Sequence, residues 1–340
     1  MAAQSSRTSM LKAGLAVAGI TCMALGLAGG PARADTALPP GGHIAATIAD
    51  PAGPAGVEAG FGSVWVANGP AGTIIRIDPV SDKVVATIQA GRPVCCLTFG
   101  ANAVWAASFA TDTVVRIDPA ANSVADAFPS GGLAPQGIAF GDGYVWVANH
   151  HGNPTGSVAK IDPATDTVID VIPVGAASPT GGPSFLAAVP GSVWAAVPNQ
   201  SALVRIDTAT GAIAATIPVR GACGEVAANS QQVWVSGGTP PGCSPGVSLV
   251  NPATDSLVTH LTAGGASSGN ALGTGGFWFG ADTSDLLNRV DTSTNSVVGQ
   301  LKLPGSPGSI ATGFGSVWVA DQTNSAILKV VPDGRLWRRS

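Results

Sequence analysis

The chain has 340 residues and a formal net charge of −4, and only 11% of its residues are charged. Its few basic residues are spread along the sequence, which argues against a nucleic-acid partner. The 46 glycines and 26 prolines are typical of a protein built from short strands and tight turns.

The first 34 residues have the features of an export signal. Arg7 and Lys12 precede an apolar run over 13–30, and small residues at Ala32 and Ala34 predict cleavage after Ala34. An uncleaved anchor is the alternative, but the run is short for a spanning helix. No later stretch is apolar enough to span a membrane. We therefore expect a secreted or periplasmic, monomeric protein after cleavage of a Sec-type signal.

A tryptophan recurs in the middle of an apolar segment at intervals of roughly 40 to 48 residues. The seven copies are Trp65, Trp105, Trp146, Trp194, Trp234, Trp278 and Trp318. This period fits one four-stranded blade of a β-propeller, a unit that buries its two faces only by stacking on its neighbours. The sequence therefore predicts an all-β, seven-bladed propeller of antiparallel blades, with the tryptophans between blades.

One repeat shows how a blade is divided into strands. Residues 137–140, 144–148, 157–162 and 167–172 form apolar segments rich in Val and Ile, and Gly, Asp and Pro separate them. We name these strands a, b, c and d from the channel outward. A basic residue and an aspartate recur on strand c, as in Arg76-Ile77-Asp78-Pro79. Because most blades repeat them, we interpret them as structural: the aspartate starts a turn, and the basic residue pairs locally or lies along the blade surface.

The two ends of the chain complement each other. The last repeat stops after 327–332, before its outer strand, and residues 45–48 repeat the letters of Ala214–Ile217. We expect strand 43–48 to complete the last blade and leave no free sheet edge. Residues 35–340 then form a single domain, with its blades running through 332 and a short tail at 333–340.

Three insertions depart from the repeat. They lie in the b–c loops around 149–156 and 237–246 and in the d–a loop at 175–183. In an antiparallel blade these two kinds of loop emerge on the same face. The sequence therefore predicts an enlarged rim over blades three to five.

This rim holds His150 and His151, flanked by Asn149 and Asn153. One alternative is a metal site, although adjacent histidines on an extended chain point apart and further ligands are sparse. A second is an acid, base or ligand contact. The third is ordinary surface polarity.

Strand a lines the channel, so the position nine residues before each tryptophan should lie near one channel mouth. These positions hold Gly56, Cys96, Gly137, Phe185, Glu225, Gly269 and Ser309. Glu225 is the acidic member, and Glu58 lies two positions deeper in blade one. A carboxylate among small and apolar neighbours could have a raised pKa or hold a cation, and solvated channel polarity is the alternative.

Four cysteines follow the predicted signal. Cys223 and Cys243 belong to the start and the extended b–c loop of blade five, so we expect a disulfide between them. Cys95 and Cys96 then form either a vicinal disulfide or two thiols.

The repeat resembles the YVTN-repeat (YncE-like) propeller family of exported bacterial and archaeal proteins. The resemblance rests on Val64–Asn68, Arg76–Pro79 and Val84–Ile88, and it implies a binding protein for a partner or ligand. The tryptophan-bearing strand is also similar to virginiamycin B (streptogramin) lyase, which implies a histidine, acid-bound magnesium and acids three residues after the tryptophans. Of those seven positions, only Asp321 is acidic.

Three functions follow from these observations. The first is a module that binds a protein or small-molecule ligand through the rim of blades three to five, without metal or cofactor. The second is a magnesium-dependent lyase or hydrolase with His150 or His151 and Glu225 as reacting groups. The third is a structural protein of the cell envelope.

Overall fold

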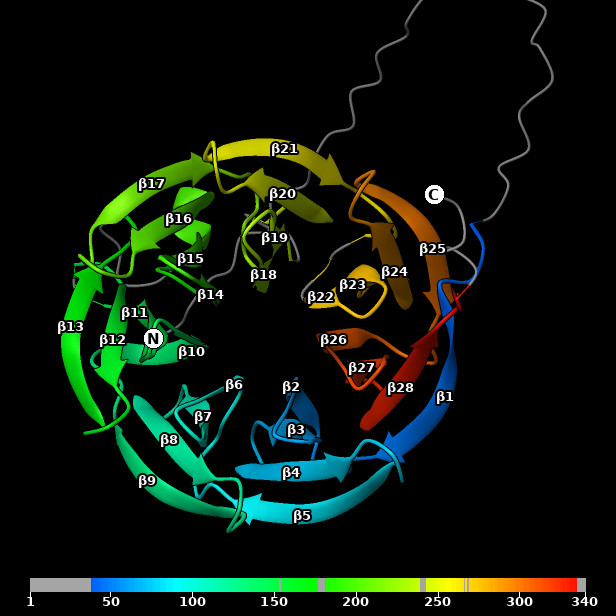
Figure 1. Cartoon of the computed structure of the whole chain (residues 1–340), viewed down its shortest axis with the longest axis horizontal. Helices are drawn as coiled ribbons and strands as arrows, with labels where there is room; N and C mark the ends of the chain where they lie inside the picture. The colour runs from blue at the N-terminus through cyan, green and yellow to red at the C-terminus, as the bar shows by residue number, and fades with distance from the viewer. Residues whose placement is uncertain are drawn as a thin grey trace, which may run out of the picture. The chain divides into compact units, whose positions relative to one another are not determined.

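The computed structural model describes residues 38–152, 154–176, 181–238, 243–265, 267 and 269–334. In it, seven four-stranded antiparallel sheets surround a central channel (Figure 1), which confirms the predicted propeller. Asn153 and the predicted signal with its cleavage site lie outside the described residues. Within those residues, no helix has the length and apolarity needed to cross a membrane.

Each blade is ordered from the channel outward. Blade one comprises β2 (Pro54–Gly60), β3 (Ser63–Asn68), β4 (Thr73–Asp78) and β5 (Lys83–Gln89). Blade two comprises β6 (Leu97–Gly100), β7 (Ala103–Ser108), β8 (Thr113–Asp118) and β9 (Ser123–Pro129). Blade three comprises β10 (Leu133–Gly141), β11 (Tyr144–His151), β12 (Ser157–Asp162) and β13 (Thr167–Pro173). Blade four comprises β14 (Leu186–Val189), β15 (Ser192–Val197), the 3-10 turn η1 (Pro198–Gln200), β16 (Ala202–Asp207) and β17 (Ile213–Pro218).

The remaining blades follow the same order. Blade five comprises β18 (Val226–Ala228), β19 (Val233–Ser236), β20 (Val247–Asn251) and β21 (Ser256–Leu261). Blade six comprises β22 (Asn270–Gly273), β23 (Gly276–Ala281), β24 (Leu286–Asp291) and β25 (Ser296–Lys302). Blade seven comprises β26 (Pro307–Gly313), β27 (Ser316–Asp321), β28 (Ala326–Pro332) and β1 (Gly42–Ala49).

The ring closes in blade seven, as the sequence predicts. Strand β1 pairs antiparallel with β28, and His43 lies opposite Val331 and Ile48 opposite Ile327. The strand is one residue longer at each end than the predicted 43–48. The edge of β28 is therefore paired by the N-terminal strand, which removes an open edge that could pair with another chain.

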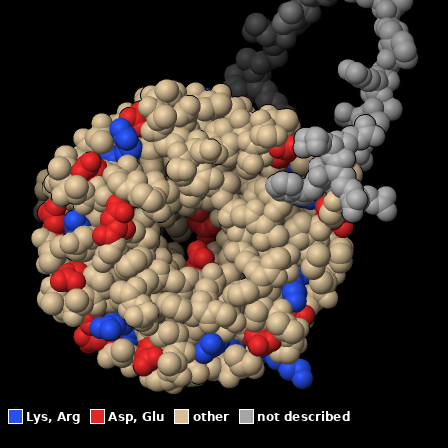
Figure 2. Space-filling view, viewed as in Figure 1, with Lys and Arg blue, Asp and Glu red and all other residues tan. Residues whose placement is uncertain are grey.

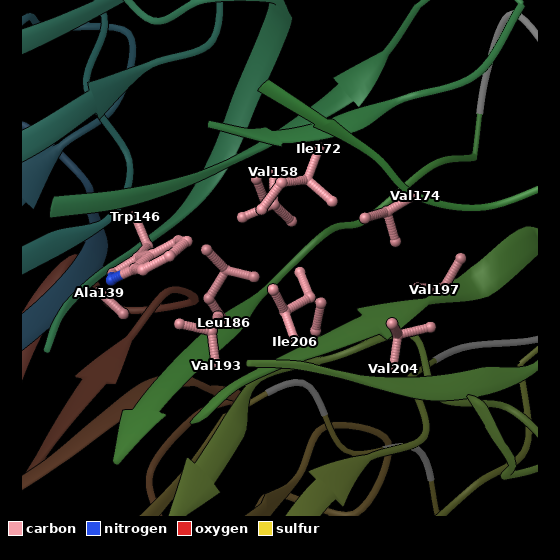
Figure 3. Packing of buried hydrophobic residues seen from close by; sticks show 12 residues of the cluster. Ala139, Trp146, Val158, Ile172, Val174, Leu186, Val193, Val197, Val204 and Ile206 are labelled. Atoms are coloured by element: carbon pink, nitrogen blue, oxygen red, sulfur yellow. The ribbon is translucent and has the colours of Figure 1, made fainter. Parts of the chain in front are cut away.

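The hydrophobic core lies between the blades. All seven repeated tryptophans are fully buried, whereas the outer strands β5 and β13 are mostly exposed and have a single buried residue each. Figure 3 shows one such layer, in which Trp146 of blade three shares a cluster with Leu186, Val193 and Ile206 of blade four. The apolar pattern on both faces of each b strand is explained by these two-sided contacts.

The basic residue of strand c joins neighbouring blades. Arg116 lies over the ring of Trp105 in its own blade, and its Nη1 donates to Asp166 in the c–d turn of blade three at 2.9 Å. Lys329 likewise lies over Trp318 and reaches Asp82 of blade one at 2.8 Å. The predicted contacts within the blade are present, since both side chains lie over their own tryptophan and Arg76 Nε donates to Ser63 Oγ of its own blade at 2.7 Å. The sequence did not reveal the second contact, which reaches the next blade.

That aspartate performs the predicted turn role. In blade one, Asp78 Oδ1 accepts hydrogen bonds from the N–H groups of Val80 and Ser81 at 3.0 and 2.7 Å. These bonds lower the pKa of Asp78, because they favour the ionised carboxylate.

Blade five lacks the basic residue, since Leu249 occupies its position opposite Trp234. Gln232 replaces it: its Nε2 donates to Thr292 O at 2.8 Å and to Asn295 Oδ1 at 3.1 Å in blade six. The connection between blades is thus kept with neutral groups.

Candidate ligand-binding cavity in the channel

A cavity of about 490 Å³ lies in the channel at the end of the ring that carries the b–c turns. Its wall comes mainly from the first residues of the inner strands, and Phe109 and Gln322 of the b–c turns complete it. All seven blades bring this inner region to the channel, so residues far apart in the sequence meet there. The cavity has the size of an ordinary small-molecule site.

Glu58 and Glu225 are the charged side chains in this wall. Of the residues that line the cavity in the described part of the chain, none is Lys or Arg. Figure 2 shows the same arrangement, with acidic side chains inside the central opening and the visible basic side chains toward the outer edge of the ring. Among the described residues that line the cavity, no Lys or Arg therefore offsets the negative charge that these carboxyl groups carry when they are ionised.

The carboxylate of Glu225 is held by blades six and seven. Its Oε2 accepts a hydrogen bond from Asn270 N at 2.9 Å, and Ser309 and the N–H of Ile310 also bond to it. The Nδ2 of Asn270 donates in turn to the backbone oxygen of Glu225 and to Ser236 Oγ, both at 2.6 Å. This network fixes the orientation of Glu225 in the channel.

Burial raises the pKa of Glu225 to about 7, against the hydrogen bonds that lower it. Burial also raises the pKa of Glu58 to about 8, and the negative charge of Glu225 adds to the effect. The charge of Asp282 in blade six also raises the pKa of Glu225, so both carboxyl groups titrate close to neutral pH. A bound cation would favour ionisation of both.

The wall next to this pair contains two free thiols, those of Cys95 and Cys96. Both are partly exposed to the cavity, and they are hydrogen-bonded to each other. The hydrogen bond from Cys96 lowers the pKa of Cys95. It raises that of Cys96, where burial and the charges of Cys95, Glu225 and Glu58 act in the same direction.

The histidines lie at the rim, and they do not join the carboxyl pair. They end strand β11, where His151 pairs with Leu133, so the predicted b–c loop starts three residues later than expected. Neither imidazole is among the described residues that line the cavity. Phe109 connects the two regions, since it lines the cavity and packs against His151 with ring centroids 5.8 Å apart.

Two of the predicted insertions meet at His150. Its Nδ1 lies 3.1 Å from Gly182 O, and Gly182 N donates to His150 O at 2.9 Å. Burial and the neighbouring His151 lower the pKa of His150, which favours the neutral ring. The b–c extension of blade three and the d–a extension are therefore one connected rim segment.

The predicted disulfide between Cys223 and Cys243 is present and ties down the third insertion. It is consistent with an oxidising, extracellular compartment. Within the described residues, no group of three or more His, Cys, Asp or Glu side chains is arranged to hold a metal ion.

Two other residues predicted for the rim have structural contacts. Asn149 is fully buried and accepts a hydrogen bond from Ser130 Oγ at 2.8 Å. Asp321 is also buried and accepts from Asn324 N and Nδ2 at 3.0 and 2.9 Å. Asn149 thus holds the d–a link that precedes blade three, and Asp321 holds its own b–c turn.

Sequence reasoning found Glu58 and Glu225 but missed the roles of Asn270, Ser309 and the cysteine pair. For Ser309 and Cys96 the signal was available, since both occupy the same repeat position as Glu225. Asn270 lies one residue further along its strand, and its contact depends on the register between blades.

With this geometry in place, the class of the protein is a seven-bladed β-propeller with a cavity in its channel. Solved structures of similar fold include a streptogramin B lyase, with a TM-score of 0.69 and 18% identity over 84% of this chain and 95% of that chain. They also include the Kuenenia stuttgartiensis hydrazine synthase, with a TM-score of 0.73 and 13% identity over 91% and 99%. A third is the Neurospora crassa Pan2 WD40 domain, with a TM-score of 0.69 and 14% identity over 86% and 95%.

At these identities the likeness shows the fold alone. No protein-family model matches the chain, and no curated protein matches it. The YVTN-repeat resemblance therefore stays a prediction.

Proposed function

We propose that this chain is an exported binding protein that takes a small ligand with a cationic group, such as a protonated amine, into the channel cavity. The observation that carries the proposal is the pair of carboxyl groups, Glu58 and Glu225, in one cavity whose described lining residues include no Lys or Arg. Their raised pKa values reflect the cost of burying negative charge there, and a ligand cation would offset that cost.

The rest of the wall suits the carbon skeleton of such a ligand. Val57, Leu97, Ile138 and Leu186 supply apolar surface, and Phe109 offers an aromatic ring near the mouth. Orientation would come from the carboxylates, and most of the contact area from the aliphatic side chains.

The rim of blades three to five would form one side of the approach to this cavity. His151 contacts Phe109, which lines the cavity, so the rim and the cavity wall share a side chain. The extended b–c loops at 149–156 and 237–246 then select which ligands reach the channel.

Calorimetric titration with a panel of primary and quaternary amines tests the proposal. Binding should strengthen as pH rises from about 6 to 9, because the carboxyl groups lose protons, and binding near neutral pH should release protons to the buffer. Glu58→Gln and Glu225→Gln should each weaken binding at least tenfold. Asp126→Asn, which removes an equal charge from the exposed outer strand β9, should leave binding unchanged.

Amine binding that survives both glutamine substitutions would refute the cavity as the site. Shortening the 149–156 and 237–246 loops tests the rim separately. If ligand selectivity is the same in both shortened forms, the rim has no part in recognition.

A lyase or hydrolase is the second candidate. The observation that favours it is a pair of carboxyl groups with pKa values of about 7 and about 8 in one cavity, which is suited to acid–base work near neutral pH. The resemblance to virginiamycin B lyase implies bound magnesium. Among the described residues, however, no three His, Cys, Asp or Glu side chains lie together as candidate ligands. The reacting groups would then be the two carboxyls.

Incubation with a streptogramin-type cyclic ester, with and without magnesium, tests this candidate by mass spectrometry. Turnover that Glu58→Gln and Glu225→Gln both abolish would support it. Absence of ring opening in either condition would remove it.

A further inference from the structure

We propose that Cys95 and Cys96 form a modification site at which a small disulfide undergoes thiol–disulfide exchange, leaving the two sulfurs joined in a vicinal disulfide. The site does not depend on the proposed amine ligand. It rests on the free thiols of two adjacent residues. Both thiols line the same cavity, and they are hydrogen-bonded to each other.

The backbone holds the pair at the edge of the channel. Cys95 N donates to Ala107 O at 3.0 Å, and Ala107 N donates to Cys96 O at 3.1 Å, so both residues are fixed to strand β7 just before β6 begins. The Sγ of Cys95 lies 3.4 Å from Gln136 O in blade three. The thiols are therefore presented to the cavity from a rigid strand, where a small reagent can reach them.

The two thiols differ in reactivity. The hydrogen bond from Cys96 lowers the pKa of Cys95, which makes Cys95 the attacking group, because the thiolate is the nucleophile. The hydrogen bond with Cys95 and burial raise the pKa of Cys96, and the charges of Cys95, Glu225 and Glu58 add to the effect. Cys96 is therefore protonated at rest and suited to the second, resolving step.

The exchange is balanced in two steps. The Cys95 thiolate attacks one sulfur of the small disulfide, which breaks the S–S bond, releases one small thiol and leaves a mixed disulfide on Cys95. Cys96 then loses its proton and attacks the Cys95 sulfur, which releases the second small thiol. The two cysteines are oxidised by two electrons in total, and the small disulfide is reduced to two thiols.

The product should be easy to reduce. Adjacent Cα atoms across a trans peptide are about 3.8 Å apart, whereas ordinary disulfides join Cα atoms roughly 4.4 to 6.8 Å apart, and shorter spans store strain. A strained disulfide has a more oxidising potential and is labile. The modification is therefore reversible, in contrast to the Cys223–Cys243 bond, whose Cα atoms are 5.9 Å apart.

The test uses the folded protein after cleavage of the predicted signal, which contains Cys22. The protein is mildly reduced and freed of reductant, and 4,4′-dithiodipyridine is the probe. We expect two equivalents of thiopyridone per chain, no retained adduct by mass, and recovery of both thiols with dithiothreitol. Peptide mapping should show that Cys223–Cys243 is unchanged, since Arg116 and Arg205 place the two pairs on separate tryptic peptides.

Single variants separate the two steps. Cys96→Ser should release one equivalent and keep the adduct, and Cys95→Ser should do the same at a rate at least roughly tenfold lower. In the Cys95→Ser background, Glu58→Gln should speed the reaction of Cys96, and the control Asp126→Asn should not.

Two results would overturn the proposal. One is a folded protein that releases no thiopyridone until it is denatured. The other is a wild-type protein that stops at one equivalent with a stable adduct. Both are read from the wild-type chain and so do not depend on the folding of any variant.

Discussion

The two ends of the ring are built in different ways. At the end with the c–d turns, aspartates hold regular turns, and basic residues reach across to the next blade in the same manner, as Arg116 does to Asp166. At the end with the b–c turns, the loops vary in length, a disulfide ties one of them, and the channel opens into a cavity with Glu58 and Glu225. The comparison shows that the repeated residues build the propeller, whereas the residues that deviate from the repeat form the cavity and its ionisable groups.

The largest expected effect is a change to the shared core that supports both ends. Trp146→Ala should lower the free energy of unfolding by about 3 to 5 kcal/mol, because it removes a fully buried ring between blades three and four. Chemical denaturation followed by fluorescence measures this. Val171→Ala on the exposed outer strand of the same blade is the control and should cost much less. Equal losses would mean that the blades do not rely on the inter-blade layer.

The next effect concerns the irregular end alone. Replacing Cys223 and Cys243 together by Ser should lower the free energy of unfolding by about 2 to 4 kcal/mol, because the unfolded chain regains the freedom of a loop closed over 20 residues. Thermal unfolding with and without reductant measures the change. If the double variant is as stable as the wild type, the disulfide does not constrain this rim.

The sequence predicts the regular end of the ring better than the end that carries the cavity. The blade count and the c–d turns were predictable because each is repeated, and the closing strand was predictable because the two ends of the chain complete one repeat. The register, with His43 opposite Val331, came from the structure. Glu58 and Glu225 were found as exceptions to a repeat position. Their raised pKa values were not predictable, because they depend on how deeply two carboxyl groups from blades one and five are buried where the blades meet.

At the regular end, the contacts between neighbouring blades could not be predicted from the sequence either. The sequence indicated a structural role for Arg116, but its partner lies in the next blade, and the spacing along one chain does not reveal which turn faces it. Likewise, the sequence around Gln232 does not indicate that this side chain makes the contact with blade six that a basic residue makes in other blades. To predict contacts between repeats, one must know how the blades stack on one another.

A smaller effect should appear in the pH dependence of stability. Glu58 has a pKa of about 8 in the folded chain, above its ordinary value of 4.5, so the folded state holds more protons than the unfolded state between these values. Stability should therefore fall as pH rises through this window, by on the order of 1 to 3 kcal/mol once the water in the channel is allowed for.

Glu58→Gln should flatten this decline, and Glu225→Gln should flatten it in part, because Glu225 has the smaller shift, to about 7. Denaturation midpoints measured from about pH 5 to pH 8 give the slope. The control Asp126→Asn should keep the wild-type slope. An unchanged slope in Glu58→Gln would mean that this carboxyl is ionised in the folded chain at all these values.

The smallest expected effect distinguishes the charged from the neutral connections between blades. A double-mutant cycle of Arg116→Met and Asp166→Asn should give a coupling of about 0.5 to 1 kcal/mol, because the pair is partly exposed, and the coupling should shrink at high salt. Gln232→Leu, which removes the neutral connection from blade five to blade six, should cost a similar amount that does not change with salt. A coupling near zero would show that the guanidinium acts through packing on Trp105 and not through Asp166. In that case the regular end of the ring would be held by stacking, and its ion pairs would only set the direction in which each side chain points.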